Sequence, residues 1–295
     1  MTRHAYLIMC HNNFDVLEKL VSALDDPRND IYIHIDKKVR NIAKIRHRLH
    51  VFHATLTFTK RIRVSWGGFS QIQAELILLQ EAVKKEHAYY HLISGVDMPL
   101  KNQDYIHAFF AANQGKEFIS IDDKSENGAL FAARIMHYHF LQDFIGRNQG
   151  LHIAVAYKIE QFLLKAQSLL KINRLCNFSG YVYKGGNWFS ITHDMAEYIL
   201  RCKKQINNFR FGLCADELFL QTIAMTSPYS ENITGNILRY VDWKRGNPYT
   251  FRGDDFELLI TSDKLFARKF DEKIDIDIVY RIYEHLMVTN ESVTI

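Results

Sequence analysis

The stretch "YLIMCHNNFDVLEKLVSALDDPRNDIYIHIDKK", residues 6–38, decides the fold class. It begins with a short apolar run and ends with an alternating, β-branched run, both typical of strands. Between them, apolar residues recur at helical spacing at Phe14, Leu17, Leu20, Val21 and Leu24. Strand, helix and strand in this order form a βαβ unit. The stretch therefore predicts an α/β protein with a parallel sheet covered by helices.

The same alternation continues along the chain. Helices are predicted over 70–85, with Ser70 as N-cap and Gln73 at the capping-box position, and over 151–173. Strands are predicted over 88–95, 117–122 and 188–192, the last followed by one helix over 193–205. No internal repeat or low-complexity linker interrupts the pattern. The sequence predicts one mixed α/β domain over 1–295 with a helical C-terminal part.

Composition excludes several classes of protein. The 295 residues are 47% hydrophobic, which is enough for one large core, and the net charge of +4 is too small for a nucleic-acid-binding protein. The four cysteines, at 10, 176, 202 and 214, form no CxxC pair and are interpreted as thiols of a reducing compartment. No apolar run reaches the roughly 18 residues of a spanning helix, so we expect a cytoplasmic protein.

Familiar catalytic motifs are absent: the chain has no GxGxxG, GxxxxGK[ST], HExxH or GxSxG. Asp36 instead draws attention, because it ends the strand over 30–38 and ligands of α/β sheets bind beyond such ends. Trp66 stands beside Gly67 and Gly68, which let backbone approach a ligand closely. A solvated turn acid and a turn with a packing tryptophan are the plainer alternatives.

Two further segments carry charge in unusual settings. Asp97 follows the strand over 88–95 but has no second aspartate two residues away, and Asp275–Asp277 is the one literal Asp-x-Asp. The segment 239–271 interleaves aromatic residues with Lys244, Arg245, Arg252, Arg268 and Lys269. Such cations can neutralise a diphosphate in place of a metal. A solvated basic face is the alternative, although apolar residues on both sides of 268–269 indicate partial burial.

Seven stretches, in order, resemble one known family: "YIHIDKK", "VSWGGFSQIQAELILLQEAV", "YYHLISGVDMPLK", "GGNWFSIT", "ADELFLQTI", "YVDWKRGNP" and "DKLFARKFD". They are similar to the core-2/I-branching glycosyltransferases, glycosyltransferase family 14, which also contains peptide-O-xylosyltransferases. The resemblance spans Ala5 to Asp277. Without the membrane anchor and cysteine-rich pattern of the animal enzymes, the chain looks like a bacterial member with a role in polysaccharide biosynthesis.

The resemblance implies a GT-A-type fold with a mixed, mostly parallel sheet flanked by helices. Residues of about 1–120 would form the nucleotide-binding half, and about 121–295 the acceptor and catalytic half. It also implies inverting transfer of a sugar, GlcNAc in the first place, from a UDP-sugar to a hydroxyl of a glycan acceptor. No divalent metal or other cofactor is expected.

The resemblance also implies roles for individual residues. Glu217 matches the general base of a "DE" motif, and Lys269 matches the lysine that, with Arg245 or Arg252 beside it, holds the donor diphosphate. The remaining predicted donor contacts are Asp36, Asp97 and Arg268. The predicted acceptor contacts are Trp243, which matches a tryptophan that stacks on the acceptor sugar, Trp188 and Trp66.

The stretch "CADELFLQTI", residues 214–223, places Asp216 and Glu217 side by side at an expected helix start. Adjacent helical residues diverge by about 100°, so the two carboxylates cannot face one hydroxyl. Aspartate is a favoured N-cap, and Asp216 is therefore assigned to capping and Glu217 to the site. One base suffices for inversion by single displacement with a stabilised leaving group.

Other interpretations stay open. The chain could transfer xylose or another sugar from a UDP-sugar, or be a non-catalytic glycan- or nucleotide-binding protein on the same fold. The helix over 151–173, with Lys158, Lys165 and Lys171, could contact anionic lipid headgroups as a peripheral membrane element. A lipid-linked acceptor at the inner face of the membrane would suit that arrangement. Residues 122–186 differ from the animal enzymes, which leaves the acceptor open.

Overall fold

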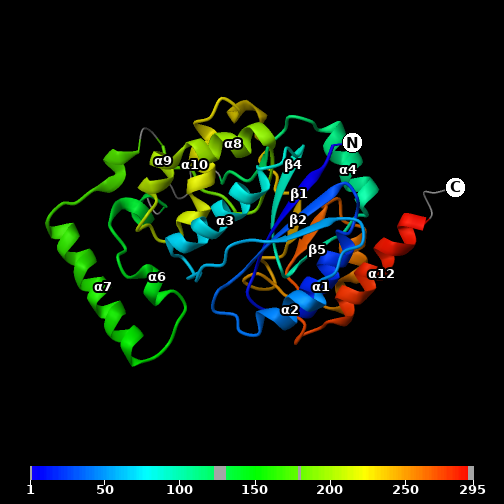
Figure 1. Ribbon diagram of the computed structural model, residues 1–295. Helices are drawn as coiled ribbons and strands as arrows, with labels where there is room; N and C mark the ends of the chain where they lie inside the picture. The colour runs from blue at the N-terminus through cyan, green and yellow to red at the C-terminus, as the bar shows by residue number, and fades with distance from the viewer. Residues whose placement is uncertain (1, 123–130, 179–180, 292–295) are drawn as a thin grey trace.

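The structure is a computed structural model that describes residues 2–122, 131–178 and 181–291 (Figure 1). The strands are β1 His4–Cys10, β2 Asn29–Ile35, β3 Thr55–Phe58, β4 Tyr89–Ser94, β5 Asp97–Pro99, β6 Phe118–Ile119, β7 Phe189–Thr192, β8 Arg239–Val241 and β9 Phe266–Arg268. The α-helices are α1 Phe14–Ala23, α2 Ile42–Arg48, α3 Phe69–Ala82, α4 Gln103–Ala112, α6 Gln142–Ile145, α7 Leu151–Leu169, α8 His193–Arg201, α9 Lys203–Asn208, α10 Phe219–Met225, α11 Phe256–Ile260 and α12 Asp277–Glu291.

A six-stranded sheet in the order β3-β2-β1-β4-β7-β6 forms the centre of the molecule. Strands β1 to β4 run parallel, and β7 and β6 continue the sheet with antiparallel pairings. Every residue of β2 and β4 is buried, as expected for parallel strands with helices on both faces. The predicted α/β class and the mixed, mostly parallel sheet are confirmed.

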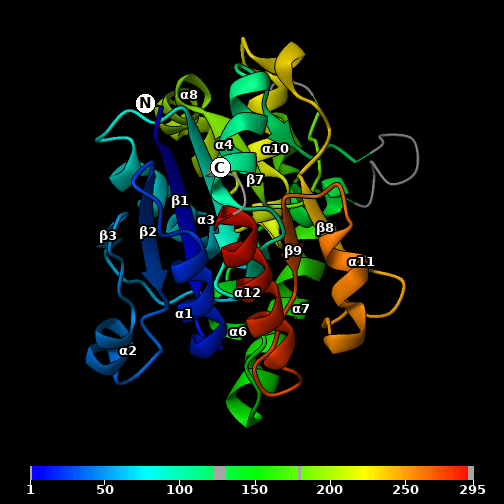
Figure 2. The same cartoon turned by 90° about the vertical axis from the view of Figure 1, so that its right-hand side faces the viewer.

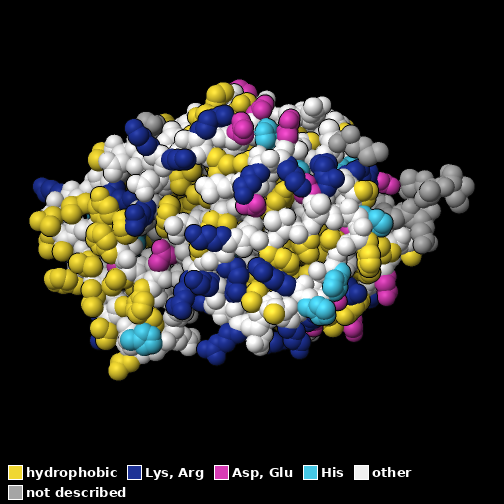
Figure 3. All heavy atoms as spheres, viewed as in Figure 1, with side chains coloured by type: hydrophobic (Ala, Val, Ile, Leu, Met, Phe, Trp, Pro, Cys, Tyr) yellow, Lys and Arg dark blue, Asp and Glu magenta, His cyan; other side chains and the backbone are white. Residues whose placement is uncertain are grey.

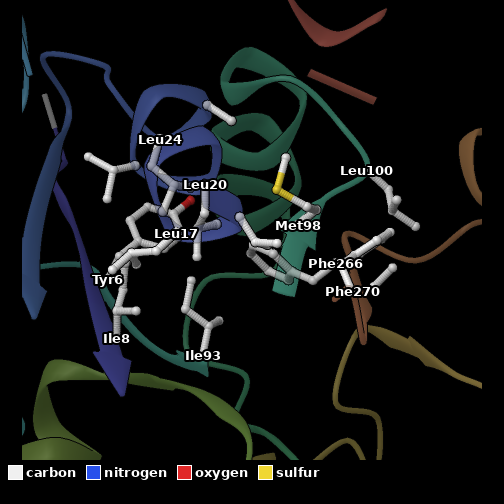
Figure 4. Packing of buried hydrophobic residues seen from close by; sticks show 14 of the residues in the cluster. Tyr6, Ile8, Leu17, Leu20, Leu24, Ile93, Met98, Leu100, Phe266 and Phe270 are labelled. Atoms are coloured by element: carbon white, nitrogen blue, oxygen red, sulfur yellow. The ribbon is translucent and has the colours of Figure 1, made fainter. Parts of the chain in front are cut away.

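Alternate residues of β1 feed two separate cores. Tyr6 and Ile8 pack with α1, α12 and β9 on one face, and Ala5 and Leu7 pack with α3 and α8 on the other. Figure 4 shows the first core, in which side chains from α1 meet Phe266 and Phe270 near the C-terminus. Figure 2 shows α12 lying beside α1 over this face. The C-terminal part of the chain therefore closes the core of the N-terminal part.

A second sheet, β5-β9-β8, joins distant parts of the chain. Asp97 of β5 pairs with Arg268 of β9, and Arg268 also pairs with Val241 of β8. Strands β8 and β9 come from the segment 239–271, for which the sequence predicted no strands. Their three-residue length explains this, because an alternation so short carries little pattern.

Several predicted element boundaries were wrong. Ser70 does not cap α3: the N-cap is Gly68, and the Ser70 hydroxyl instead donates to Asp143 at 2.5 Å. The helix predicted over 193–205 breaks at Cys202 into α8 and α9. The strand predicted over 117–122 is confined to β6. In each case a contact distant in sequence, or a short local turn, overrides the local pattern.

The boundary expected near residue 120, between the nucleotide-binding half and the acceptor half, falls inside the large sheet. Strands β6 and β7 lie on either side of this boundary in sequence, and they pair with each other. No helix of the described residues is long and apolar enough to cross a membrane.

Candidate active site

The carboxyl ends of β1, β2 and β4 meet at one edge of the large sheet, because these strands run parallel. Asp36 follows β2 at this edge, and its amide donates to the Cys10 carbonyl at 2.9 Å. Its buried carboxylate accepts from the Lys38 amide at 2.8 Å and lies 3.5 Å from Lys38 Nζ. Asp36 therefore lies where ligands of open α/β sheets bind, as predicted.

His11 follows β1 at the same edge. Partial removal of its ring from water lowers the pKa of His11 from its ordinary value; Asp36 opposes this shift, while Lys38 and Arg268 add to it. The Arg268 guanidinium also donates to the hydroxyl of Ser94, the last residue of β4. Arg268 of the second sheet thus reaches the edge formed by the first.

Asp97 is the centre of a buried charge cluster. Its carboxylate accepts from the Ser94 hydroxyl at 2.5 Å and from Arg268 Nη1 at 3.0 Å, and lies 3.9 Å from Arg239 Nε. The side chains of Asp97 and Arg239 have no exposed surface. Burial lowers the pKa of Arg239 to about 10, and Asp97 opposes the shift. The donor contact expected of Asp97 stays a prediction; in this structure its oxygens accept from Ser94 and Arg268.

Trp188 packs against the same cations. The Arg268 guanidinium lies 4.4 Å from the Trp188 ring centroid, and that of Arg239 lies 5.9 Å from it. Such stacking suits the planar guanidinium. Trp188 was predicted to contact the acceptor; in the structure it packs against Arg268, a predicted donor residue, and against Arg239.

Arg245 and Arg252, the two candidates for the arginine that acts with Lys269, have different surroundings. Arg245 lies between Asp242 at 2.6 Å and Asp255 at 2.7 Å and stacks on Tyr249. The side chains of Arg252 and Lys269 form no ion pair within the part of the chain that the structure describes. The two also lie close together, because the amide of the residue before Arg252 donates to the Lys269 carbonyl at 3.0 Å.

Trp243 extends from the same end of the second sheet. It comes two residues after β8, whose last residue pairs with Arg268, and 65% of its surface is exposed. Lys269 directly follows Arg268, so Trp243 and Lys269 leave two parallel strands at the same edge. An exposed aromatic ring beside cations without acidic partners suits a sugar-nucleotide ligand.

Glu217 lies in a 3₁₀ turn, Ala215–Glu217, directly before α10. Its partly exposed carboxylate accepts from Arg134 Nη1 at 2.7 Å, and its carbonyl accepts from the Gly185 amide at 3.0 Å. Trp188 comes three residues after Gly185, a step of at most about 11 Å of extended chain. The segment 185–188 therefore joins Glu217 to the cations around Trp188.

Asp216 does not cap the following helix, contrary to the prediction. Helix α10 begins at Phe219 with Leu218 as N-cap, and no side chain bonds to its free amides. The 3₁₀ turn instead directs Asp216 into the interior, where it accepts from Gln71 Nε2 at 2.9 Å beside the buried Glu75. Burial, with help from the charge of Glu217, raises the pKa of Asp216 to about 7.

Trp66 lies in the loop before α3, and this loop is joined to the segment that carries Glu217. The carbonyl of Gly67 accepts from the Cys214 amide at 2.9 Å, three residues before Glu217. Gly67 has a φ of 71°, and a Cβ atom there would meet Gln142 Nε2 at 2.9 Å, so a larger residue would be strained. Trp66 is 45% exposed, and Arg147 lies 4.3 Å from its ring centroid. An aromatic ring thus lies open near the proposed base.

Sequence reasoning missed His11, Arg134 and Arg239. His11 could have been found, because it follows β1 as Asp36 follows β2 and parallel strands share their carboxyl edge. Arg239 stands one residue before the stretch "YVDWKRGNP". Arg134 lies in a segment without a recognisable pattern, and only the fold brings it to Glu217. In the described ranges, no three His, Cys, Asp or Glu side chains gather as a metal site.

Comparison with known proteins identifies the family. A family model described as "Core-2/I-Branching enzyme" matches residues 4–263. The chain belongs to this family. This confirms the resemblance seen in the sequence.

Relatives within the Core-2/I-branching family differ in the activity that their names state. The chain is 25% identical to the N-acetyllactosaminide beta-1,6-N-acetylglucosaminyl-transferase of Mus musculus, over 90% of this chain and 68% of that protein. It is 21% identical to xylosyltransferase 2 of Rattus norvegicus, over 97% of this chain but 34% of that protein. The chain therefore spans about a third of the xylosyltransferase. Both relatives are glycosyltransferases.

A solved structure of mouse xyloside xylosyltransferase 1 aligns with 90% of this chain and 97% of its own, at 11% identity and a TM-score of 0.39. The arrangement of sheet and helices in this chain is read from its own strands and helices, described above.

Proposed function

We propose that this protein is a metal-independent, inverting glycosyltransferase. It would move a sugar, GlcNAc in the first place, from a UDP-sugar to a hydroxyl of a glycan acceptor. The observation that carries the proposal is the joining of a partly exposed carboxylate, Glu217, to a cluster of cations through the segment 185–188. Membership of a glycosyltransferase family supports it.

The donor diphosphate would be held by Lys269 and Arg252. Their side chains have no acidic partner among the described residues, whereas the charge of Arg245 is already balanced by Asp242 and Asp255. Charge-assisted hydrogen bonds from such groups can supply the stabilisation that a divalent metal gives elsewhere. Asp36, at the sheet edge, would contact the uridine.

Glu217 would act as general base. In the reaction the acceptor oxygen attacks the anomeric carbon, the bond from that carbon to the diphosphate breaks, and UDP leaves with the bonding electrons. The hydroxyl proton passes to the Glu217 carboxylate. Arg134 would orient that carboxylate, and Trp66 and Trp243 offer exposed rings for the acceptor sugar.

Glu217→Gln tests the assignment of the base. The substitution keeps the shape but removes the proton acceptor, so transfer from UDP-GlcNAc should fall by about a hundredfold or more. UDP affinity, measured by calorimetry, should stay within a factor of about two because the base does not hold the nucleotide. Wild-type transfer by this variant would disprove the role of Glu217.

The family also supports a second donor, since xylosyltransferases are among the relatives. Parallel assays with UDP-GlcNAc and UDP-xylose distinguish the two. Binding of UDP without turnover of any nucleotide sugar would favour the non-catalytic alternative.

A further inference from the structure

Helix α7 turns one row of apolar residues outward. Leu151, Phe162 and Leu169 are 84%, 70% and 84% exposed, and Val155 and Ile159 are also exposed. At about 100° per residue, 151, 155, 162 and 169 fall on one face of the helix. This outer face of α7, defined by Leu151, Val155, Ile159, Phe162 and Leu169, is visible as hydrophobic side chains on the left of Figure 3.

Two polar residues of α7, Glu160 and Gln167, face the protein instead. Glu160, nine positions after Leu151 and so about 180° around the helix, is 3% exposed and accepts from the Leu141 amide at 3.1 Å. The buried amide of Gln167 exchanges two hydrogen bonds with the backbone of Tyr138, at 2.7 and 3.0 Å. The orientation of α7 is therefore fixed by hydrogen bonds, and its apolar stripe stays exposed among the residues that the structure describes.

Exposed charge on residues 141–175 is mainly cationic, with Asp143 as the one exposed acid. From 141 to 175 the chain carries two acids: Glu160, which is buried, and Asp143, which accepts from the Ser70 hydroxyl and amide. The exposed charges are otherwise cationic: Arg147, Lys158, Lys165 and Lys171. An exposed apolar stripe flanked by lysines matches the chemistry of an interfacial helix on anionic lipid.

Neighbouring rings widen the apolar surface. Phe140 and Phe144 are exposed on the segment that leads into α7, and Figure 1 shows α6 and α7 together at the edge of the molecule, away from the large sheet. A large contiguous apolar area on a protein surface marks a site of contact. We infer that the outer face of α7 docks on an anionic membrane surface, with the apolar stripe entering the headgroup region and the lysines at the phosphates.

The test is flotation of the purified chain with vesicles of phosphatidylcholine, alone or mixed with phosphatidylglycerol. Wild type should float with the anionic vesicles and much less with the neutral ones. Phe162→Ser with Leu169→Ser should reduce flotation by about tenfold or more, because the buried apolar area drives interfacial binding. The matched control is Phe52→Ser with Leu258→Ser, two exposed apolar residues elsewhere, which should float like wild type.

A second pair of variants tests the charge. Lys158→Glu with Lys165→Glu should remove the preference for anionic vesicles, and Lys203→Glu with Lys204→Glu, on α9, should keep it. UDP affinity should be unchanged in every variant, which separates this inference from the proposed function.

Two outcomes would overturn the inference. Wild type could fail to float with anionic vesicles, or the Phe162/Leu169 variant could float like wild type. If wild type does not float and sediments as a dimer that the same variant dissociates, the outer face of α7 is an interface between two copies of this chain.

Discussion

Two adjacent carboxylates, Asp216 and Glu217, have opposite environments in the folded chain. Glu217 is partly exposed and paired with Arg134, whereas Asp216 is buried beside Glu75 with one oxygen unpartnered. The 3₁₀ turn separates them: it directs Asp216 into the interior and the next residue, Glu217, toward solvent. The prediction that only one of the two faces the site is consistent with this geometry, but the role given to Asp216 is not.

Burial of Asp216 makes stability depend on pH. Its folded pKa of about 7 lies above the ordinary value near 3.8, so the folded state binds the proton more tightly. The stability gained from this proton is complete below about pH 4 and is lost as pH rises through about 7, at up to about 1.4 kcal/mol per pH unit. Asp216→Asn should therefore flatten the fall in the free energy of unfolding between about pH 4 and about pH 7, measured with urea.

The control for Asp216→Asn is Asp254→Asn, which removes an exposed carboxylate and should leave the pH dependence as in wild type. Burial and the charge of Asp216 both raise the pKa of Glu75, so Asp216→Asn also lowers the contribution of Glu75, whereas Asp254→Asn leaves it in place. An unchanged slope in Asp216→Asn would show that Asp216 is ionised in the folded chain.

The contributions of individual cations to UDP binding can be measured one at a time. Lys269→Ala and Arg252→Ala should each weaken UDP binding by roughly ten- to a hundredfold, the loss expected for a charge-assisted hydrogen bond. Arg245→Ala is the matched control, because its charge is balanced by Asp242 and Asp255, and its effect should stay below about threefold. Calorimetric titration with UDP measures all three. If only Arg245→Ala weakened UDP binding, Arg245 and not Arg252 would be the arginine that holds the diphosphate.

At the scale of elements, periodicity predicted the long segments and missed the short ones. Helices α1, α3 and α7 and strands β1, β2 and β4 have enough turns or alternations to show a pattern. Strands β5, β8 and β9 have three residues each, and they exist because they pair with one another across the chain. The site depends on these pairings, so sequence motifs could name Lys269 and Glu217 but not their surroundings.

The segment 185–188 carries a prediction of its own. A Cβ atom at Gly185 would lie 1.9 Å from the Ser120 carbonyl oxygen, whereas one at Gly186 would meet the nearest atom at 3.4 Å. Gly185→Ala must therefore shift the backbone that joins Glu217 to Trp188. Gly185→Ala should lower the free energy of unfolding by about 1–3 kcal/mol, the usual cost of overpacking. It should also lower the transfer rate by about a hundredfold, the loss that a displacement of catalytic groups by about 1 Å can cause.

Gly186→Ala is the neighbouring control and should keep transfer within a factor of about three, since its new methyl group meets only ordinary contacts. Thermal unfolding and transfer rates of the two variants should be compared under the same conditions. Equal activity of Gly185→Ala and wild type would mean that the segment does not set the position of the base.

At the scale of the whole molecule, the C-terminal strands and helix complete a site that the N-terminal βαβ unit begins. Asp36 and His11 come from the first sheet, and Arg268 and Lys269 come from a segment more than 200 residues later. The long sequence separation explains why the fold class could be predicted from residues 6–38, while the assembly of the site required the structure.

This architecture predicts how the enzyme responds to metal removal and to salt. If Lys269 and Arg252 hold the diphosphate, EDTA should leave transfer within a factor of about two of its untreated rate, because no divalent ion takes part. Rising NaCl should weaken UDP binding, since the Debye length falls from about 10 Å at 0.1 M to about 3 Å at 1 M and screens exposed cations. The Lys269→Ala variant should show a smaller salt dependence than wild type, which ties the effect to that residue. Loss of transfer in EDTA that Mn²⁺ restores would contradict the cationic site and require a metal at the diphosphate.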